Sequence, residues 1–123
     1  MRTNKINKMR TKIINGWEYE RELHTEMNTF SKIKIPKGWK LITFGELMLL
    51  WNDYREDFNF GKDNRFNEIV ENPLKEKRKK YPYWNVWLAG LADGSGVCGY
   101  YRDSSYLTVR GVRFKRKVKN ENK

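Results

Sequence analysis

Apolar side chains recur at helical spacing over about three turns in the middle of the chain. This period predicts an amphipathic helix. Thr43 precedes the apolar stripe and Glu46 follows three residues later, the spacing of a capping box, in which each side chain bonds to the backbone of the other residue. A second, shorter helix is predicted for residues 64–71, ending before Pro73. The apolar positions are Leu47, Leu50, Trp51, Tyr54 and Phe58 in the first helix and Phe66, Ile69 and Val70 in the second.

Alternating patterns predict strands on both sides of these helices. Residues 12–27 hold one or two short strands, with Asn15-Gly16 as the turn of a hairpin. Trp17 and Tyr19 alternate with two glutamates, so the two rings share one face.

Further strands are predicted after the first turn and in the last third of the chain. Residues 39–42 follow a Pro-Lys-Gly turn and form a brief strand. Residues 83–92, 97–101 and 107–114 read as three strands joined by Gly/Ser/Asp turns. In the last strand, the alternation of apolar and polar residues shifts by one position at Gly111, which predicts a bulge.

Residues 93–106 have the composition of a recognition surface. Eleven of these fourteen residues are Gly, Ser, Tyr or Asp. Tyrosine provides rigid contact area, and the small polar residues provide adaptable hydrogen bonds. The chain has 16 Lys and 10 Glu, yet none lies between Tyr81 and Phe114. Interior strands and tight turns also avoid Lys and Glu, an alternative that fits residues 86–92 better than the Tyr/Ser/Asp run.

The net charge of +11 is concentrated in three short segments, residues 2–12, 75–80 and 113–119, which hold fifteen of the 26 basic residues. Such blocks form solvated arms or contact nucleic acid phosphates or an acidic partner. Single-strand binding favours aromatic residues interleaved with basic ones, and here the two classes are mostly segregated along the sequence. We therefore expect a basic flexible arm over residues 1–12, one domain over residues 13–114 and a basic tail over residues 115–123.

Several classes of chemistry are disfavoured by the residues present. Cys98 is the single cysteine, so no internal disulfide is possible, and His24 has no evident metal-ligand partners. Three aspartates, at positions 53, 57 and 63, lack the spacing of a calcium-binding loop. We expect no catalytic residues, no metal and no cofactor. No apolar run reaches the length of a membrane span, and we expect no signal peptide and no membrane insertion.

The order of these parts resembles the C-type-lectin fold. The run PKGWKLITFGELMLLW is similar to the early signature of that fold, in which a Gly-Trp turn precedes a strand and a capped helix. The closing VWLA, DGSG and VRGVRF runs are similar to the end of the same domains, so the resemblance covers about residues 36–114. It implies an α+β fold with two helices packed on short antiparallel sheets and with the N- and C-terminal strands paired.

Among proteins of this fold, the chain most resembles the variable proteins of diversity-generating retroelements. Formylglycine-generating enzymes use a pair of cysteines, and this chain has one. Calcium-dependent lectins use an EPN- or QPD-type loop, which is missing, and the WND run at residues 51–53 falls within the predicted helix. In the variable proteins, adenine-directed changes cluster on one exposed surface near the C-terminus, which implies a variable binding region over residues 85–110. Lys, Glu, Met, Gln and Trp cannot arise from Asn codons in this way, and none occurs over residues 88–110.

The resulting hypothesis is a calcium-independent, non-enzymatic protein that recognises an unknown macromolecular ligand, expected to be a protein. The alternative is a nucleic-acid-binding or virion structural protein that acts through its basic arms. The Lys/Asn/Ile-rich composition favours a viral or microbial source, and a cytoplasmic or virion-associated location is expected. The predicted ligand-binding residues are Gly90, Tyr100, Tyr101, Asp103, Ser104, Ser105, Tyr106, Thr108 and Arg110.

Overall fold

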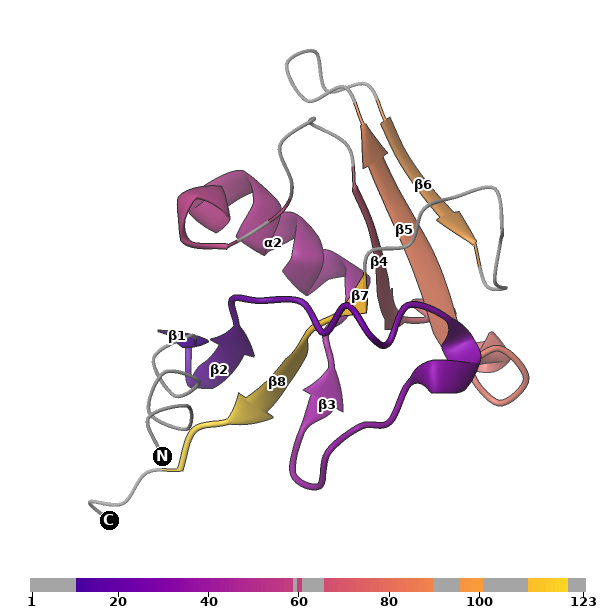
Figure 1. The fold of residues 1–123 in the computed structure, drawn as a ribbon, viewed down its shortest axis with the longest axis horizontal. Coiled ribbons are helices and arrows are strands. Elements are labelled where there is room, and N and C mark those ends of the chain that lie inside the picture. Colours follow the sequence, from indigo (N-terminus) through magenta and orange to yellow (C-terminus); the bar gives the residue numbers. More distant parts are fainter. Residues whose placement is uncertain (1–10, 59, 61–65, 90–95, 101–110, 120–123) are drawn as a thin grey trace.

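One α-helix and two four-stranded sheets make up the part of the chain that the computed structural model describes, residues 11–58, 60, 66–89, 96–100 and 111–119 (Figure 1). The first sheet has the order β1-β2-β8-β3 and is antiparallel throughout. The second has the order β6-β5-β4-β7, in which β7 pairs with β4 in parallel. The strands are β1 (Thr11–Ile14), β2 (Trp17–Glu20), β3 (Lys40–Leu41), β4 (Phe66–Glu71), β5 (Tyr83–Ala89), β6 (Gly96–Tyr100), β7 (Gly111–Val112) and β8 (Phe114–Lys117).

The predicted N-terminal hairpin is confirmed. Asn15 and Gly16 both have positive φ, 52° and 84°, as a type I′ turn requires, and this turn joins β1 to β2. The pairing of β2 with β8 confirms the expected pairing of the N- and C-terminal strands. Strands extend to Thr11 and Lys117, beyond the expected domain limits of residues 13 and 114.

The predicted capped helix is also confirmed, as α2 (Phe44–Tyr54). The backbone N–H of Glu46 donates to the Thr43 hydroxyl over 3.2 Å, and the Thr43 N–H donates to the Glu46 carboxylate over 2.9 Å. The helix ends before Phe58, which is buried after a 3₁₀ turn, η2 (Arg55–Asp57).

The second predicted helix is wrong, because residues 66–71 form strand β4. Ile69 and Val70 are each 1% exposed although they point to opposite faces of the strand. A strand covered on both faces contains consecutive apolar residues, and over so short a run this pattern resembles a helical one. The two-helix arrangement expected from the resemblance is therefore not seen in the described residues, which contain α2 and three 3₁₀ turns. The remaining turns are η1 (Phe30–Lys32) and η3 (Lys75–Lys77).

The chain crosses from the second sheet to the first within three residues. Val112 pairs with β4, Phe114 pairs with β3, and Arg113 lies between the two sheets. This crossing coincides with the change of apolar phase that was expected to mark a bulge. Gly111 adopts a φ of 148°, and a Cβ atom at this position would overlap the carbonyl oxygen of His24.

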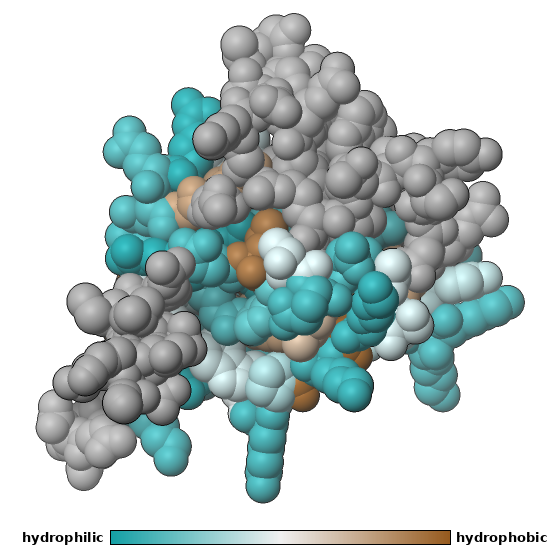
Figure 2. Space-filling view, in the orientation of Figure 1, coloured by the Kyte–Doolittle hydropathy of each residue, from teal (hydrophilic) through white to brown (hydrophobic). Residues whose placement is uncertain are grey.

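The described hydrophobic residues form two clusters. The larger one joins α2 to both sheets, and the smaller one packs around β8 and the segment before β3. Figure 2 shows mainly hydrophilic side chains over the described surface on one face of the molecule. No helix among the described residues is long and apolar enough to span a membrane. The buried members of the clusters are Ile14, Tyr19, Ile42, Leu47, Leu50, Trp51, Phe58, Phe60, Val70 and Val86 in the larger and Ile33, Ile69, Val112 and Phe114 in the smaller.

Candidate functional site

Most of the predicted ligand-binding residues lie outside the described part of the chain. Tyr100 is described as the last residue of β6, where its backbone pairs opposite Asn85 of β5. The other predicted residues, Gly90, Tyr101, Asp103, Ser104, Ser105, Tyr106, Thr108 and Arg110, fall within residues 90–95 and 101–110.

The strands that border these two segments belong to the same sheet. Residues 90–95 connect β5 to β6, and residues 101–110 connect β6 to β7. Strands β6 and β7 lie at opposite edges of the sheet, with β5 and β4 between them. Asn85 and Val86 of β5 are fully buried, as is Val112 of β7. Strands β5 and β7, which flank the predicted binding region, are therefore held by the protein core.

A buried ion pair fixes the chain directly after β7. Arg113 and Glu68 are each 1% exposed, and the guanidinium donates to both carboxylate oxygens, over 3.1 and 2.7 Å. A third nitrogen donates to the carbonyl oxygen of Arg21 over 2.7 Å. The guanidinium also lies 4.8 Å from the ring centroid of Phe60 and 5.6 Å from that of Phe58. A planar cation with a bidentate partner is the arrangement in which two buried charges are best compensated.

His24 ties the N-terminal segment to the same crossing. Its backbone N–H donates to the carbonyl of Val112 over 2.8 Å, and its Nε2 lies 2.9 Å from the carboxylate of Glu20. Glu20 in turn accepts from the backbone N–H of Phe114 over 2.8 Å. The hydrogen bond with Glu20 raises the pKa of His24 above its ordinary value, against the opposing effect of burial. The role of His24 is thus structural, and no metal-binding group of side chains occurs among the described residues.

A second candidate site lies on the first sheet, where three lysines surround Trp17. The ammonium nitrogens of Lys115, Lys117 and Lys40 lie 4.4, 5.2 and 5.8 Å from the centroid of the Trp17 ring. The strand register explains this, because Trp17 pairs opposite Lys117 and Lys40 opposite Lys115. The sequence reading that aromatic and basic residues are segregated does not hold for this sheet. The partners are up to 100 residues apart, and only strand pairing could have revealed them.

Lys115 is the one of these lysines that a carboxylate neutralises. Its ammonium group contacts both oxygens of Glu46, over 2.7 and 2.6 Å, and the Tyr19 hydroxyl donates to Glu46 over 3.0 Å. Burial acts to raise the pKa of Glu46, but hydrogen bonds from Lys115 and from the Thr43 backbone outweigh it and hold the pKa below its usual value. Burial, together with the charge of Glu46, raises the pKa of Tyr19.

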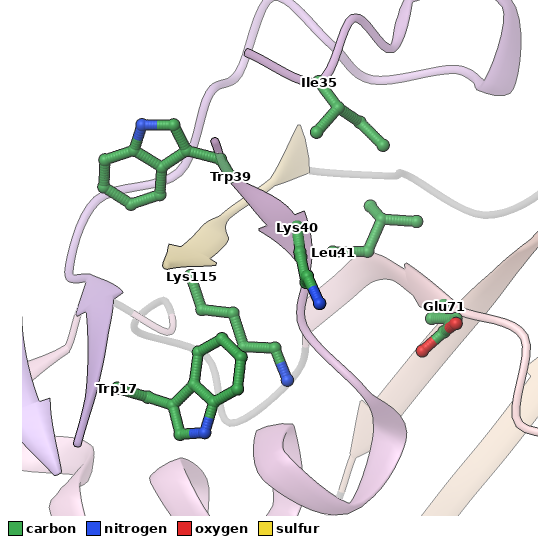
Figure 3. Close-up of a pocket in the computed structure, with 7 residues that line it drawn as sticks. All are labelled: Trp17, Ile35, Trp39, Lys40, Leu41, Glu71 and Lys115. Carbon is green, nitrogen blue, oxygen red and sulfur yellow. The ribbon is translucent and has the colours of Figure 1, made fainter. Parts of the chain in front are cut away.

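Two of these lysines, Lys40 and Lys115, and the rings of Trp17 and Trp39 border a pocket of about 410 Å³. Figure 3 shows Trp17 and Lys115 side by side and Trp39 on the other side of β8. The guanidinium of Arg116 lies 4.5 Å from the centroid of the Trp39 ring and donates to Glu18 over 2.7 Å. The pocket is lined by Trp17, Ile35, Trp39, Lys40, Leu41, Glu71 and Lys115.

The described residues thus define a small α+β domain with mainly antiparallel sheets, one helix and a cationic, aromatic pocket. Comparison of the chain with protein-family models, curated proteins and solved structures finds no match. A functional assignment for this chain therefore depends on its own residues and their geometry.

Proposed function

We propose that this chain is a calcium-independent, non-enzymatic recognition protein with a C-type-lectin-like domain, related to the variable proteins of diversity-generating retroelements. It binds a macromolecular partner, most simply a protein, through the Tyr/Ser/Asp/Gly-rich residues that connect β5, β6 and β7. The contact residues are those named above from Gly90 to Arg110. The proposal is based on the composition of this segment and on the strands that flank it.

The observation that carries the proposal is the anchoring of this segment at its described ends. On one side, Val86 of β5 is fully buried in the larger hydrophobic cluster. On the other, Val112 is fully buried, and Arg113 holds Glu68 of β4 in the buried ion pair. Anchored ends reduce the conformational entropy lost on binding, because less of the surface has to be ordered by the partner.

The proposed side chains suit the contacts of a protein interface. Tyr101 and Tyr106 provide amphipathic rings of the kind found at binding hot spots. Arg110 provides a planar donor fork for carboxylates or carbonyls. Ser104 and Ser105 allow the local fit to change without loss of the framework.

The direct test replaces Tyr101 and Tyr106 together by Ala. Because these rings are proposed to be surface contacts, we expect the melting temperature to stay within a few degrees of the parent value in circular-dichroism melts. The matched control is Tyr19→Ala, since Tyr19 is 4% exposed in the core and its loss should cost about 3 kcal/mol or more. A drop for the double variant as large as that of the control would place the two rings in the core and overturn the proposal.

A displayed library tests the binding function itself. Positions 101, 104, 106 and 108 are randomised with codons that vary only at adenines, and the library is selected against lysozyme as an arbitrary protein target. We expect most unselected members to unfold cooperatively and some selected members to bind lysozyme. A library whose members are mainly unfolded would contradict a framework that tolerates diversification. The neighbouring DNA gives a separate check on the retroelement relationship, which predicts an adenine-differing copy of the 3′ coding end beside a reverse transcriptase gene.

A further inference from the structure

Two basic segments at opposite ends of the chain meet on the first sheet. Lys12 belongs to β1, and Lys115 and Lys117 belong to β8, while β2 lies between these two strands. The segment after β8 continues along the hairpin, since the backbone N–H of Val118 donates to the carbonyl of Gly16 over 2.9 Å. The fold therefore brings basic residues from both ends of the described chain, Lys12 from one and Lys115 and Lys117 from the other, onto one sheet.

Part of this charge is neutralised within the protein. Lys12 pairs with Asp57 over 2.8 Å, Lys115 with Glu46 over 2.6 Å and Arg116 with Glu18 over 2.7 Å. Each of these three cations already has a carboxylate partner. To bind an external anion, it would have to leave that partner.

Lys40 and Lys117 differ from these residues. Both are exposed, and neither forms an ion pair with a carboxylate in the described part of the chain. Lys40 lies directly opposite Lys115 in the β3–β8 pair, and Glu46 neutralises Lys115 but not Lys40. Both ammonium groups lie within 5.8 Å of the centroid of the Trp17 ring. An anionic group beside this ring would be attracted by both cations.

The volume of the pocket and the side chains that line it indicate which class of anion it would bind. A volume of about 410 Å³ falls within the range of pockets that enclose a small ligand or part of a larger one. Trp17 and Trp39 contribute indole rings to its walls, and Lys40 contributes a cation at its rim (Figure 3). Aromatic rings beside cations match unpaired bases beside phosphates, whereas duplex recognition usually inserts a helix or a strand ribbon into a groove.

We propose that this pocket, together with Lys117 beside Trp17, binds single-stranded nucleic acid, with backbone phosphates at Lys40 and Lys117 and a base against the indole of Trp17. The site is formed by β2, β3 and β8, so it does not depend on the recognition function proposed for residues 90–110. We expect a modest affinity for this site. Two phosphate contacts and one stacked base contribute less binding free energy than the many contacts in a long groove for single strands.

The test measures the binding of a fluorescein-labelled oligothymidylate of about 12 nucleotides, within the usual site size of a small single-strand-binding domain. Fluorescence anisotropy gives the association constant at several salt concentrations for the parent and for Lys40→Gln/Lys117→Gln. Each lost phosphate contact on a single strand lowers the slope of log K against log salt by about 0.7, so the double variant should be shallower by about 1.4.

The matched control is Lys75→Gln/Lys79→Gln, which removes the same charge from two exposed lysines that do not line the pocket. We expect its slope to equal that of the parent. Lys40→Arg/Lys117→Arg should restore the parental slope, because both charges are retained, and this variant guards against a folding defect in the Gln variant. Trp17→Phe should reduce the quenching of tryptophan fluorescence that the oligonucleotide causes.

Three results would overturn the proposal. Equal losses in the two Gln double variants would mean that the oligonucleotide responds only to net charge. Binding of inorganic phosphate without measurable binding of the oligonucleotide would define a site for small anions instead. Binding of a poly-glutamate peptide as tight as that of the oligonucleotide would define a surface for acidic proteins.

Discussion

Arg113, at the crossing between the sheets, and Lys115, two residues later in β8, use their positive charges in different ways. Arg113 is 1% exposed and donates to Glu68 and to the carbonyl of Arg21. Lys115 is paired with Glu46 at the border of an open pocket and also lies over Trp17. Arg113 thus joins the two sheets, whereas Lys115, which is 7% exposed, lies against the pocket.

The difference follows from where the chain crosses between sheets. Arg113 lies at the crossing itself, where side chains from both sheets exclude water. Lys115 lies one pleat further along β8, beside strands that reach the solvent. The same kind of ion pair is thus expected to contribute more to stability at Arg113 than at Lys115.

The largest effect is expected for Glu68→Gln. The change leaves the guanidinium of Arg113 without its buried counter-charge, and breaking one partner of such a pair costs about 3–5 kcal/mol. Urea unfolding followed by tryptophan fluorescence measures the loss. Glu68→Met/Arg113→Met removes both charges and should recover much of the stability, since an apolar pair leaves no uncompensated charge. Equal instability of the single and the double variant would mean that shape, not charge, is what the crossing requires.

The middle effect is expected for Lys115→Met. The carboxylate of Glu46 keeps the bonds from Tyr19 and Thr43 but loses its ammonium partner, which should cost about 1–2 kcal/mol, less than Glu68→Gln because this pair is partly solvated.

The pH dependence of the unfolding free energy of the same variant tests how Lys115 affects the pKa of Glu46. The folded protein holds the pKa of Glu46 below its unfolded value, so this group stabilises the fold above the unfolded pKa and ceases to do so as the pH falls through the folded one. In Lys115→Met that acid-side loss should diminish. The control is Lys12→Met, whose partner Asp57 is exposed, and its unfolding curve should overlay that of the parent. An unchanged acid profile in Lys115→Met would contradict the role assigned to Lys115.

The comparison also shows which features could be predicted from the sequence. The capping box at Thr43 and Glu46 and the turn at Asn15-Gly16 depend on neighbours within four residues, and both are confirmed. The coarse α+β class and the pairing of the terminal strands are confirmed as well.

The features that were missed all depend on pairing between distant segments. Residues 66–71 became a strand because β5 and β7 flank them, and short apolar runs do not reveal their neighbours. The buried partner of Arg113 is 45 residues away, and the lysines around Trp17 come from two other strands. A basic segment that seemed to be a solvated tail therefore supplies both a core ion pair and the walls of a pocket.

The smallest effect is expected at His24, on the far side of the same crossing. Hydrogen bonding with Glu20 raises the pKa of His24, so the charged imidazole stabilises the fold fully below the unfolded pKa of about 6.5, and this contribution is lost as the pH rises through the folded value. We expect the unfolding free energy to fall above about pH 6.5 by on the order of 0.5 kcal/mol, because the side chain is partly solvated. In His24→Gln this step should disappear, whereas Glu26→Gln, which alters an exposed and more distant partner at 3.5 Å, should keep most of it. A step of equal size in His24→Gln would assign the pH dependence to another group and leave the crossing supported by Arg113 alone.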